Sequence, residues 1–140
     1  MKLNKIINSR KKGFTLIELV IVVSIIAILI LIGLPKFGKI QENAKQKADV
    51  VTAKNIAMAV NSELSNGKNK TDITEKDIRD YFSGDIKQQG TINGNHPGEF
   101  SVYLIKDEEI SIFTGSRQVY PELKENATSS GTLLFKINCK

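Results

Sequence analysis

The feature that most constrains this chain is one uninterrupted apolar run near its N-terminus. Residues 14–34 form a stretch of 21 residues in which the only polar side chains are those of Thr15, Glu18 and Ser24. As an α-helix rising about 1.5 Å per residue, the run would reach roughly 30 Å, which is the thickness of the hydrocarbon core of a bilayer. We therefore expect a helix that spans a membrane over residues 14–35.

The positive charge of the chain lies entirely before this run. The formal net charge is +5, from 20 Lys and Arg against 15 Asp and Glu. Residues 1–13 hold five of the basic residues and no acid, so residues 14–140 carry 15 charges of each sign. The high isoelectric point thus reflects a short basic leader, and it does not indicate a nucleic-acid surface. Because basic residues cluster directly before the run, we expect the leader inside the cell and the rest of the chain outside.

This leader differs from an ordinary secretory signal. A secretory signal has an apolar region of about 7–15 residues followed by a cleavage site of small residues. Here the apolar run is longer, and its end at Leu34-Pro35 offers no such site. Cleavage before the run, on the cytoplasmic side, fits the sequence better.

Glu18 is the chemical exception within the run. An ionisable side chain in a membrane helix costs roughly 2.5–3.5 kcal/mol at the bilayer centre and less near an end. Judged from the residues alone, Glu18 is a glutamate at the membrane boundary that reaches back to the cytoplasmic headgroups.

The junction at the start of the run resembles a known processing site. The sequence Gly13-Phe14-Thr15-Leu16-Ile17-Glu18-Leu19, preceded by Arg10-Lys11-Lys12, is similar to that of type IV prepilins and of their relatives, the pseudopilins of type II secretion and competence systems. Counted from Phe14, Glu18 is the fifth residue and Pro35 the twenty-second, as in that family. The match covers residues 10–38.

The resemblance implies a sequence of events. A prepilin peptidase would cut after Gly13 and methylate the new amino terminus of Phe14. Assembly would then pair the Phe14 amine of one subunit with Glu18 of a neighbour, and the subunits would polymerise through residues 14–35. The implied partners are the chain itself, minor pilins, the peptidase, an assembly machinery with its ATPase, and membrane lipid before assembly.

Beyond the run, the pattern predicts that the helix continues. Gly33 and Pro35 weaken it, because glycine loosens the backbone and proline removes an amide hydrogen. One long bent helix is expected over residues 14–64, with a C-cap at Ser65-Asn66-Gly67. Its second half has an apolar stripe at helical spacing, formed by Ala53, Ile56, Ala57, Val60 and Leu64. A weaker stripe precedes it, formed by Ile40, Ala44, Ala48 and Val51.

Residues 65–140 are expected to form a small α+β head. Thr74 and Asp77 have the spacing of a capping box, and we expect them to open a short helix that presents Ile78, Tyr81 and Phe82 on one side and ends at Ser83-Gly84. A polar loop is expected over residues 67–72 and one short strand near Thr91-Ile92. Alternating residues then predict strands over 100–105, 109–114, 118–120 and 132–138. The expected fold is thus a long helix packed on an antiparallel sheet of three or four strands.

The sequence lacks the patterns of catalysis and metal binding. Its only histidine, His96, precedes a proline in an expected loop, and its only cysteine, Cys139, cannot form an intrachain disulfide. Many Gram-negative pilins have a cysteine pair that this chain lacks, so Cys139 is either a free thiol or the site of an intermolecular bridge. The acids Asp107-Glu108-Glu109 are expected in a solvated hairpin turn rather than a calcium site. We expect no enzyme, no cofactor, no metal and no nucleic-acid partner.

Three functions are compatible with these features. The first is the subunit of a type IV pilus, an extracellular fibre for adhesion, motility or biofilm formation. The second is a pseudopilin whose short fibre serves secretion or competence. The third is a monomeric membrane-anchored enzyme or binding domain, which the processing motif and the missing catalytic residues disfavour. We favour the pilus subunit, a single-pass protein of the cytoplasmic membrane before assembly and part of a surface fibre afterwards.

The junction generates a direct prediction about processing. In cells, the mature chain should begin at Phe14, and Gly13→Ala should slow leader removal less than Gly13→Leu, because the peptidase of the family requires a small residue before the cut. The N-terminus is read by mass spectrometry of the assembled protein. A mature chain that begins at Met1 or Lys2 would contradict the prediction.

Overall fold

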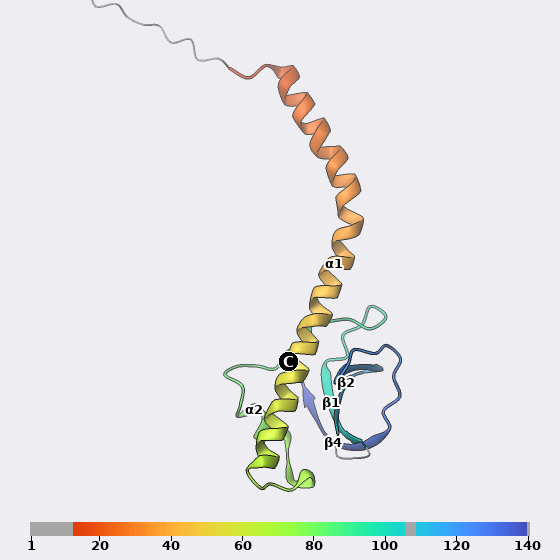
Figure 1. Ribbon diagram of the computed structural model, residues 1–140. Helices are drawn as coiled ribbons and strands as arrows, with labels where there is room; N and C mark the ends of the chain where they lie inside the picture. Colours follow the sequence, from red (N-terminus) through yellow and green to blue (C-terminus); the bar gives the residue numbers. More distant parts are fainter. Residues whose placement is uncertain (1–12, 106–108, 140) are drawn as a thin grey trace, which may run out of the picture. The chain divides into compact units, whose positions relative to one another are not determined.

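The computed structural model describes residues 13–105 and 109–139 (Figure 1). The chain divides into two compact units, residues 1–38 and 39–140, and each is described by itself. The elements in order are α1 (Leu16–Ser65), the 3-10 helix η1 (Lys70–Asp72), α2 (Glu75–Arg79), β1 (Glu99–Ile105), β2 (Ile110–Thr114), β3 (Arg117–Tyr120) and β4 (Gly131–Asn138). A long N-terminal helix and a four-stranded antiparallel sheet confirm the predicted α+β class.

The first unit contains only the beginning of α1 among its described residues. The helix runs through Pro35 without interruption, as expected. Every described side chain of this unit is exposed, including the large apolar ones from Leu16 to Leu34. A helix that is apolar all round and has no partner within its own chain requires lipid or other proteins around it. The bend expected at Gly33 and Pro35 stays a prediction.

The C-terminal end of α1 is stopped by a backbone motif that the sequence indicated. Gly67 has a φ of +88°, which an L side chain rarely adopts. Its N–H donates to the carbonyl of Leu64 at 3.0 Å, and the N–H of Lys68 donates to the carbonyl of Glu63 at 3.2 Å. These two bonds form a Schellman motif, and they satisfy carbonyls that the helix end would otherwise leave unpaired.

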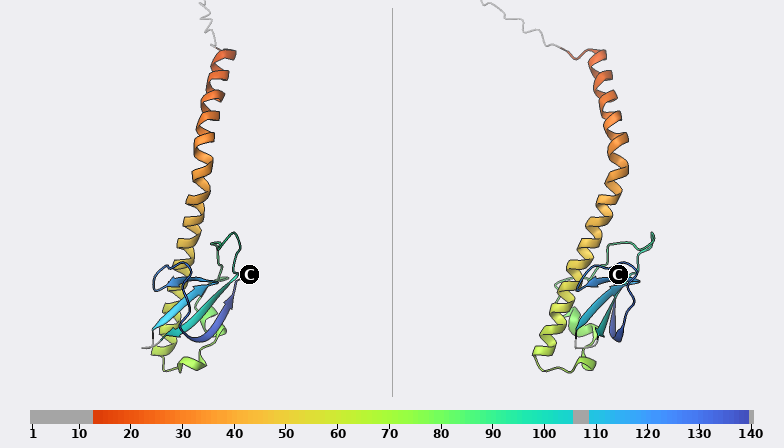
Figure 2. Two further views of the ribbon diagram at one scale, coloured as in Figure 1. Left: turned by 90° about the vertical axis from the view of Figure 1, so that its right-hand side faces the viewer. Right: turned by 45° about the vertical axis from the view of Figure 1, so that its right-hand side comes forward.

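The second half of α1 lies along one face of the sheet (Figure 2). The predicted stripe is confirmed, because the side chains of Ala53, Ile56, Ala57 and Val60 are buried and that of Leu64 is partly buried. From the sheet side, the core receives Phe100, Val102, Ile112, Val119 and Ile137.

The weaker stripe proposed for the preceding turns of α1 was wrong. Ile40 is 64% exposed and Val51 is 58% exposed, although both are apolar. The side that turns toward the head is instead polar and carries Asp49, which is 1% exposed. Apolar spacing alone misassigned the face because buried polar side chains, satisfied by loop backbone, took the place of apolar contacts.

The sheet has the strand order β3-β2-β1-β4, with every neighbouring pair antiparallel. The predicted hairpin is confirmed: β1 pairs with β2, and Val102 lies opposite Ile112. β4 pairs with the other edge of β1 through a register shift between Val102 and Tyr103. Gly131 permits the close approach at the start of β4, since a Cβ there would lie 2.4 Å from the carbonyl oxygen of Leu104.

Three local predictions need correction. The expected loop over residues 67–72 contains η1, and the expected strand near Thr91-Ile92 is only an isolated bridge between Ile92 and Asn95. The capping box is confirmed, with the Thr74 N–H donating to the Asp77 carboxylate at 2.8 Å. However, α2 ends at Arg79, and Tyr81 is 47% exposed because its hydroxyl donates to Glu63 on the surface of α1. The acidic turn at residues 106–108 lies outside the described residues.

The packing of α1 on the sheet predicts unequal effects of one substitution at two sites. Val60→Asp should lower the melting temperature sharply or prevent folding of the head, because it places an unpaired charge in a fully buried position at a cost of several kcal/mol. Val51→Asp, the matched control on the exposed side of the same helix, should change stability little. Thermal melting of the full chain in detergent, followed by near-ultraviolet circular dichroism, measures both. Equal melting of the two variants would contradict this packing.

Candidate assembly and processing site

The helix starts just after the expected cleavage junction. Gly13, Phe14 and Thr15 are not helical, and α1 begins at Leu16. The Thr15 N–H donates to Glu18 Oε2 at 2.7 Å, and the Thr15 hydroxyl donates to the same oxygen at 3.0 Å. The Glu18 N–H in turn donates to the Thr15 hydroxyl oxygen at 3.3 Å. Thr15 and Glu18 thus form a capping box, in which each residue satisfies a free donor of the first turn.

This box explains why the helix is shorter than expected at its N-terminus. The helix was expected to begin at Phe14. Thr15 is instead the N-cap residue, whose backbone is non-helical, so Phe14 lies outside the helix. The bond between Gly13 and Phe14 therefore lies outside the helix, separated from it by the cap residue alone.

The capping box also defines the environment of the Glu18 carboxylate. Both hydrogen bonds to the carboxylate come from Thr15, which is neutral, and both use Oε2. Within the part of the chain that the structure describes, no ion pair involves Glu18. The carboxylate is thus oriented by its own helix while its negative charge remains available to a cation from outside the chain. It also lies in the first turn, where the helix dipole favours an acid.

Thr15 is the site residue that the sequence analysis missed. Its signal was present, because a Thr followed three residues later by Glu before an apolar run is the pattern of a capping box. Gly33 and Pro35 lie together inside α1, about four turns further along the chain. The structure does not bring them near the capping box.

The first half of α1 exposes a long series of apolar side chains. This helix is long and apolar enough to cross a membrane by length and composition. The exposed side chains include Ile17, Leu19 and Leu31, and Leu31 is 76% exposed. The one further polar side chain of the run, Ser24, donates its hydroxyl to the Val20 carbonyl at 2.7 Å. The helix therefore presents an almost purely apolar surface in which the only charge is that of Glu18.

The head is attached to α1 through a buried acid. The carboxylate of Asp49 accepts the N–H of Gln89 at 2.7 Å, the N–H of Gly90 at 2.8 Å, and the side-chain amide of Gln88 at 3.2 Å. Gly90 is required at this position, because a Cβ there would lie 2.7 Å from Asp49 Oδ2. Three donors offset the cost of burying a carboxylate, so Asp49 fixes the loop on the helix.

A second set of polar contacts connects this loop to the sheet. The Thr91 N–H donates to Glu42 Oε1 at 2.6 Å, and this bond holds the pKa of the Glu42 carboxyl below its usual range. The buried Arg117 donates through Nη2 to the Thr91 carbonyl at 3.0 Å and through Nε to Glu125 at 2.6 Å. These residues lie far apart in sequence, so no local pattern could have indicated them.

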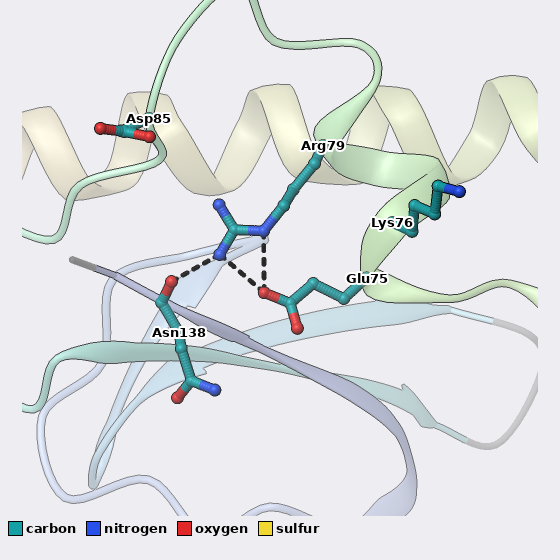
Figure 3. Close-up of a pocket in the computed structure, with 5 residues that line it drawn as sticks. All are labelled: Glu75, Lys76, Arg79, Asp85 and Asn138. Atoms are coloured by element: carbon teal, nitrogen blue, oxygen red, sulfur yellow. Dashed lines mark hydrogen bonds and ion pairs between the residues drawn. The ribbon is translucent and has the colours of Figure 1, made fainter.

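The described head contains no arrangement typical of a catalytic or metal site. The most evident surface pocket is lined by Glu75, Lys76, Arg79, Asp85 and Asn138 (Figure 3). Arg79 is already used there, by Glu75 at 2.6 Å and by the Asn138 carbonyl at 2.6 Å, while Lys76 and Asp85 point away from it. Among residues 13–105 and 109–139, no group of three or more His, Cys, Asp or Glu could hold a metal ion.

His96 and Cys139, the single histidine and cysteine of the sequence, are also not part of a catalytic or metal-binding group among the described residues. His96 is exposed in its loop. Cys139 is a free, half-buried thiol, and burial raises its pKa, which disfavours the reactive thiolate.

An apolar helix with a capped glutamate, joined to a small α+β head, is the architecture of a pilin-like protein, and comparisons with known proteins agree. The family model described as the prokaryotic N-terminal methylation motif matches residues 8–34. The chain is 41% identical over 79 residues to the type IV major pilin protein PilA of Myxococcus xanthus (strain DK1622). This alignment covers 56% of the chain and 32% of the relative, so the chain spans about a third of the length of the curated relative it matches. No solved structure matches the chain significantly.

The chain therefore carries an N-terminal methylation motif and is a distant homologue of a type IV major pilin. This confirms the resemblance stated from the sequence. The relationship is to a structural, non-enzymatic kind of protein.

The capping box generates a prediction for the first turn of α1. Thr15→Ala should speed amide hydrogen exchange at Glu18, whose N–H donates to the Thr15 hydroxyl, and at Leu19, whose N–H donates to the Thr15 carbonyl, by roughly 2- to 30-fold, the range that corresponds to the loss of a threonine cap. Thr15→Ser keeps a hydroxyl at the cap and should preserve protection. Exchange is measured on the full chain in detergent by nuclear magnetic resonance. Equal exchange in the alanine and serine variants would mean that the hydroxyl does not hold the helix start.

Proposed function

We propose that this chain is the precursor of a type IV pilus subunit. The precursor enters the membrane with its basic leader inside the cell, and a prepilin peptidase removes the leader after Gly13 and methylates Phe14. The mature subunit then leaves the bilayer and polymerises through residues 14–35 into an extracellular fibre. The observation that carries this proposal is the junction itself: a basic leader, a Gly13-Phe14 bond outside the helix, and a capped Glu18 at the start of an exposed apolar helix.

The physical requirement for polymerisation comes from the exposed run. Outside lipid, about 20 apolar residues without a partner in their own chain would be in water, and full burial of each Val, Leu or Ile is favourable by about 1.5–3 kcal/mol. Identical helices from other subunits supply the cover in a fibre. A fibre in which these helices pack together is therefore the assembly that this surface favours.

Glu18 and the new amino terminus supply the register. After cleavage, Phe14 carries an α-amine, which is the nearest cation that a second copy offers to the Glu18 of its neighbour. In an apolar environment a mispaired carboxylate costs several kcal/mol, whereas a paired one comes close to breaking even. The pair thus selects one stagger of neighbouring subunits and disfavours the others.

The proposed location and partners follow from this route. Before assembly the chain is a single-pass protein of the cytoplasmic membrane, and afterwards it is part of a fibre at the cell surface. Its partners are other copies of itself, minor pilins, the peptidase, and an assembly machinery with an ATPase. A role in adhesion, motility or biofilm formation belongs to the fibre rather than to any site in the described head.

A pair of substitutions at Glu18 tests the proposal. Glu18→Gln keeps an acceptor at the capping position and removes the charge, so leader removal and membrane insertion should persist while fibre yield falls at least about tenfold, as expected for loss of a desolvated ion pair. Glu18→Asp keeps the charge on a shorter side chain and should retain more fibres than Glu18→Gln. Sheared surface fibres are quantified by immunoblotting in a strain that lacks the native subunit.

Two outcomes would count against this function. Equal fibre yield from Glu18→Gln and wild type would remove the role of the charge. Absence of surface fibres from the wild type by electron microscopy, together with loss of secretion or DNA uptake in a deletion strain, would favour the pseudopilin instead. We prefer the pilin because the curated relative is named a major pilin.

A further inference from the structure

The segment of α1 that follows the apolar run is rich in lysine. Residues 36–54 contain five lysines and two acids, Glu42 and Asp49. From composition alone, the acids would be expected to neutralise some of the lysines along the helix surface. The structure shows a different arrangement.

Both acids of this segment are used by the loop of the head. Glu42 accepts the Thr91 N–H at 2.6 Å, and Asp49 accepts the N–H groups of Gln89 and Gly90 at 2.7 and 2.8 Å. Lys45 lies close enough to Glu42 to contribute to lowering its pKa, after the larger effect of Thr91. The helix thus turns its negative charge inward, toward backbone donors of the loop.

Lys39 and Lys47 remain as uncompensated charges on the outside. Both are exposed, and neither makes an ion pair within residues 13–105 and 109–139. Ile40, between them in the sequence, is 64% exposed. Exposed apolar and cationic side chains side by side in one helix segment are typical of a membrane interface, where the apolar part enters the headgroup region and the amines remain in water.

We propose that Lys39, Ile40 and Lys47 form a lipid-docking surface that binds the anionic headgroups of phospholipids while the subunit is still in the membrane. This inference rests on the proposed insertion of residues 14–34. The recognised chemistry is a phosphodiester at the outer surface of the bilayer, such as that of phosphatidylglycerol. The surface holds the precursor at a fixed depth and is vacated when the subunit moves into a fibre.

The distances along the chain place both lysines within range of the headgroups. At about 1.5 Å per residue, Lys39 is at most roughly 6 Å and Lys47 at most roughly 18 Å beyond Pro35. The headgroup layer on one side of a bilayer is about 5–7 Å thick, and charge acts over a further 10 Å or so at moderate salt, so Lys39 is well inside this range and Lys47 is at its outer edge. Lys54 is roughly 29 Å beyond Pro35 along the chain, outside this range.

A second copy of the chain is a poorer occupant for this surface. A symmetric contact would bring the same lysines against one another, and like charges in contact oppose association. The apolar run of a neighbour offers only Glu18 as an acid, and the proposed function already uses that residue. Charge complementarity therefore favours an anionic lipid.

The test uses the full precursor reconstituted in phosphatidylcholine vesicles, with spin-labelled phosphatidylglycerol or phosphatidylcholine as the probe. Electron paramagnetic resonance gives the ratio of the two association constants at the protein. The wild type should prefer phosphatidylglycerol, by up to about 5-fold per lysine, and added salt should reduce the preference. Lys39→Gln with Lys47→Gln should lower the ratio below that of the wild type, by up to about 5-fold for each lysine removed, while the basic leader and Lys36 stay unchanged in every variant. The matched control, Lys54→Gln with Lys76→Gln, removes the same charge from other exposed positions and should keep the ratio.

The outcomes separate this surface from the proposed function. An inserted wild type with no preference, or equal ratios in the two double variants, would overturn the lipid-docking surface and leave pilus assembly unaffected. A change in cross-linked dimers with an unchanged lipid ratio would assign the surface to a second copy and would also overturn it. A wild type that alkaline carbonate extracts from the vesicles would overturn membrane insertion, and with it both proposals.

Discussion

The apolar surface of residues 14–34 is the constraint on which the rest of this structure depends. No described side chain of the chain covers it, so its burial must come from outside the protein. A soluble protein would fold such a helix into its own core, at a gain of about 1.5–3 kcal/mol for each large aliphatic side chain. This chain instead builds its core from the second half of the same helix. The first half therefore leaves its apolar side chains exposed.

The two halves of α1 thus differ in which of their side chains are buried. From Leu19 to Leu34, the side chains are exposed and apolar apart from that of Ser24. After Ala53, a narrow buried stripe of small and branched side chains packs on the strands, as in an ordinary amphipathic helix. Between these parts, the contact with the head is polar, through Glu42 and Asp49. Carboxylates are stable at this position because they accept hydrogen bonds from backbone N–H groups of the loop, in a part of the helix that does not pack on the strands.

The two acids and Glu18 follow the same physical logic. Each carboxylate accepts backbone N–H groups of its own chain, and none of them forms a strong ion pair within the described residues. Hydrogen bonds orient a carboxylate without neutralising it, so the geometry is fixed while the charge persists. At Asp49 and Glu42 the result is a fixed loop. At Glu18 the result is an oriented charge at the start of an apolar helix, with no ion pair among the described residues.

The sequence by itself determined the features that depend on neighbours along the chain. The long helix through Pro35, its stop at Gly67, the capping box at Thr74, and the β1–β2 hairpin all follow from local backbone chemistry and side-chain period. The processing junction is equally local, and it pointed to the family that the comparisons support. The N-cap at Thr15, which was not predicted, is also local, because a Thr followed three residues later by a Glu is the pattern of a capping box.

Only the tertiary structure decided which side of the helix meets the head before Ala53. The apolar residues Ile40 and Val51 predicted one face, and buried polar contacts of Asp49 with Gly90 established another. The partners of Asp49 lie about 40 residues away in the chain, so no pattern within a helical window contains them. A buried carboxylate is stable only where folding brings hydrogen-bond donors close to it, and the sequence does not show which donors these are. It also does not show that the nearby lysines are left without an acidic partner among the described residues.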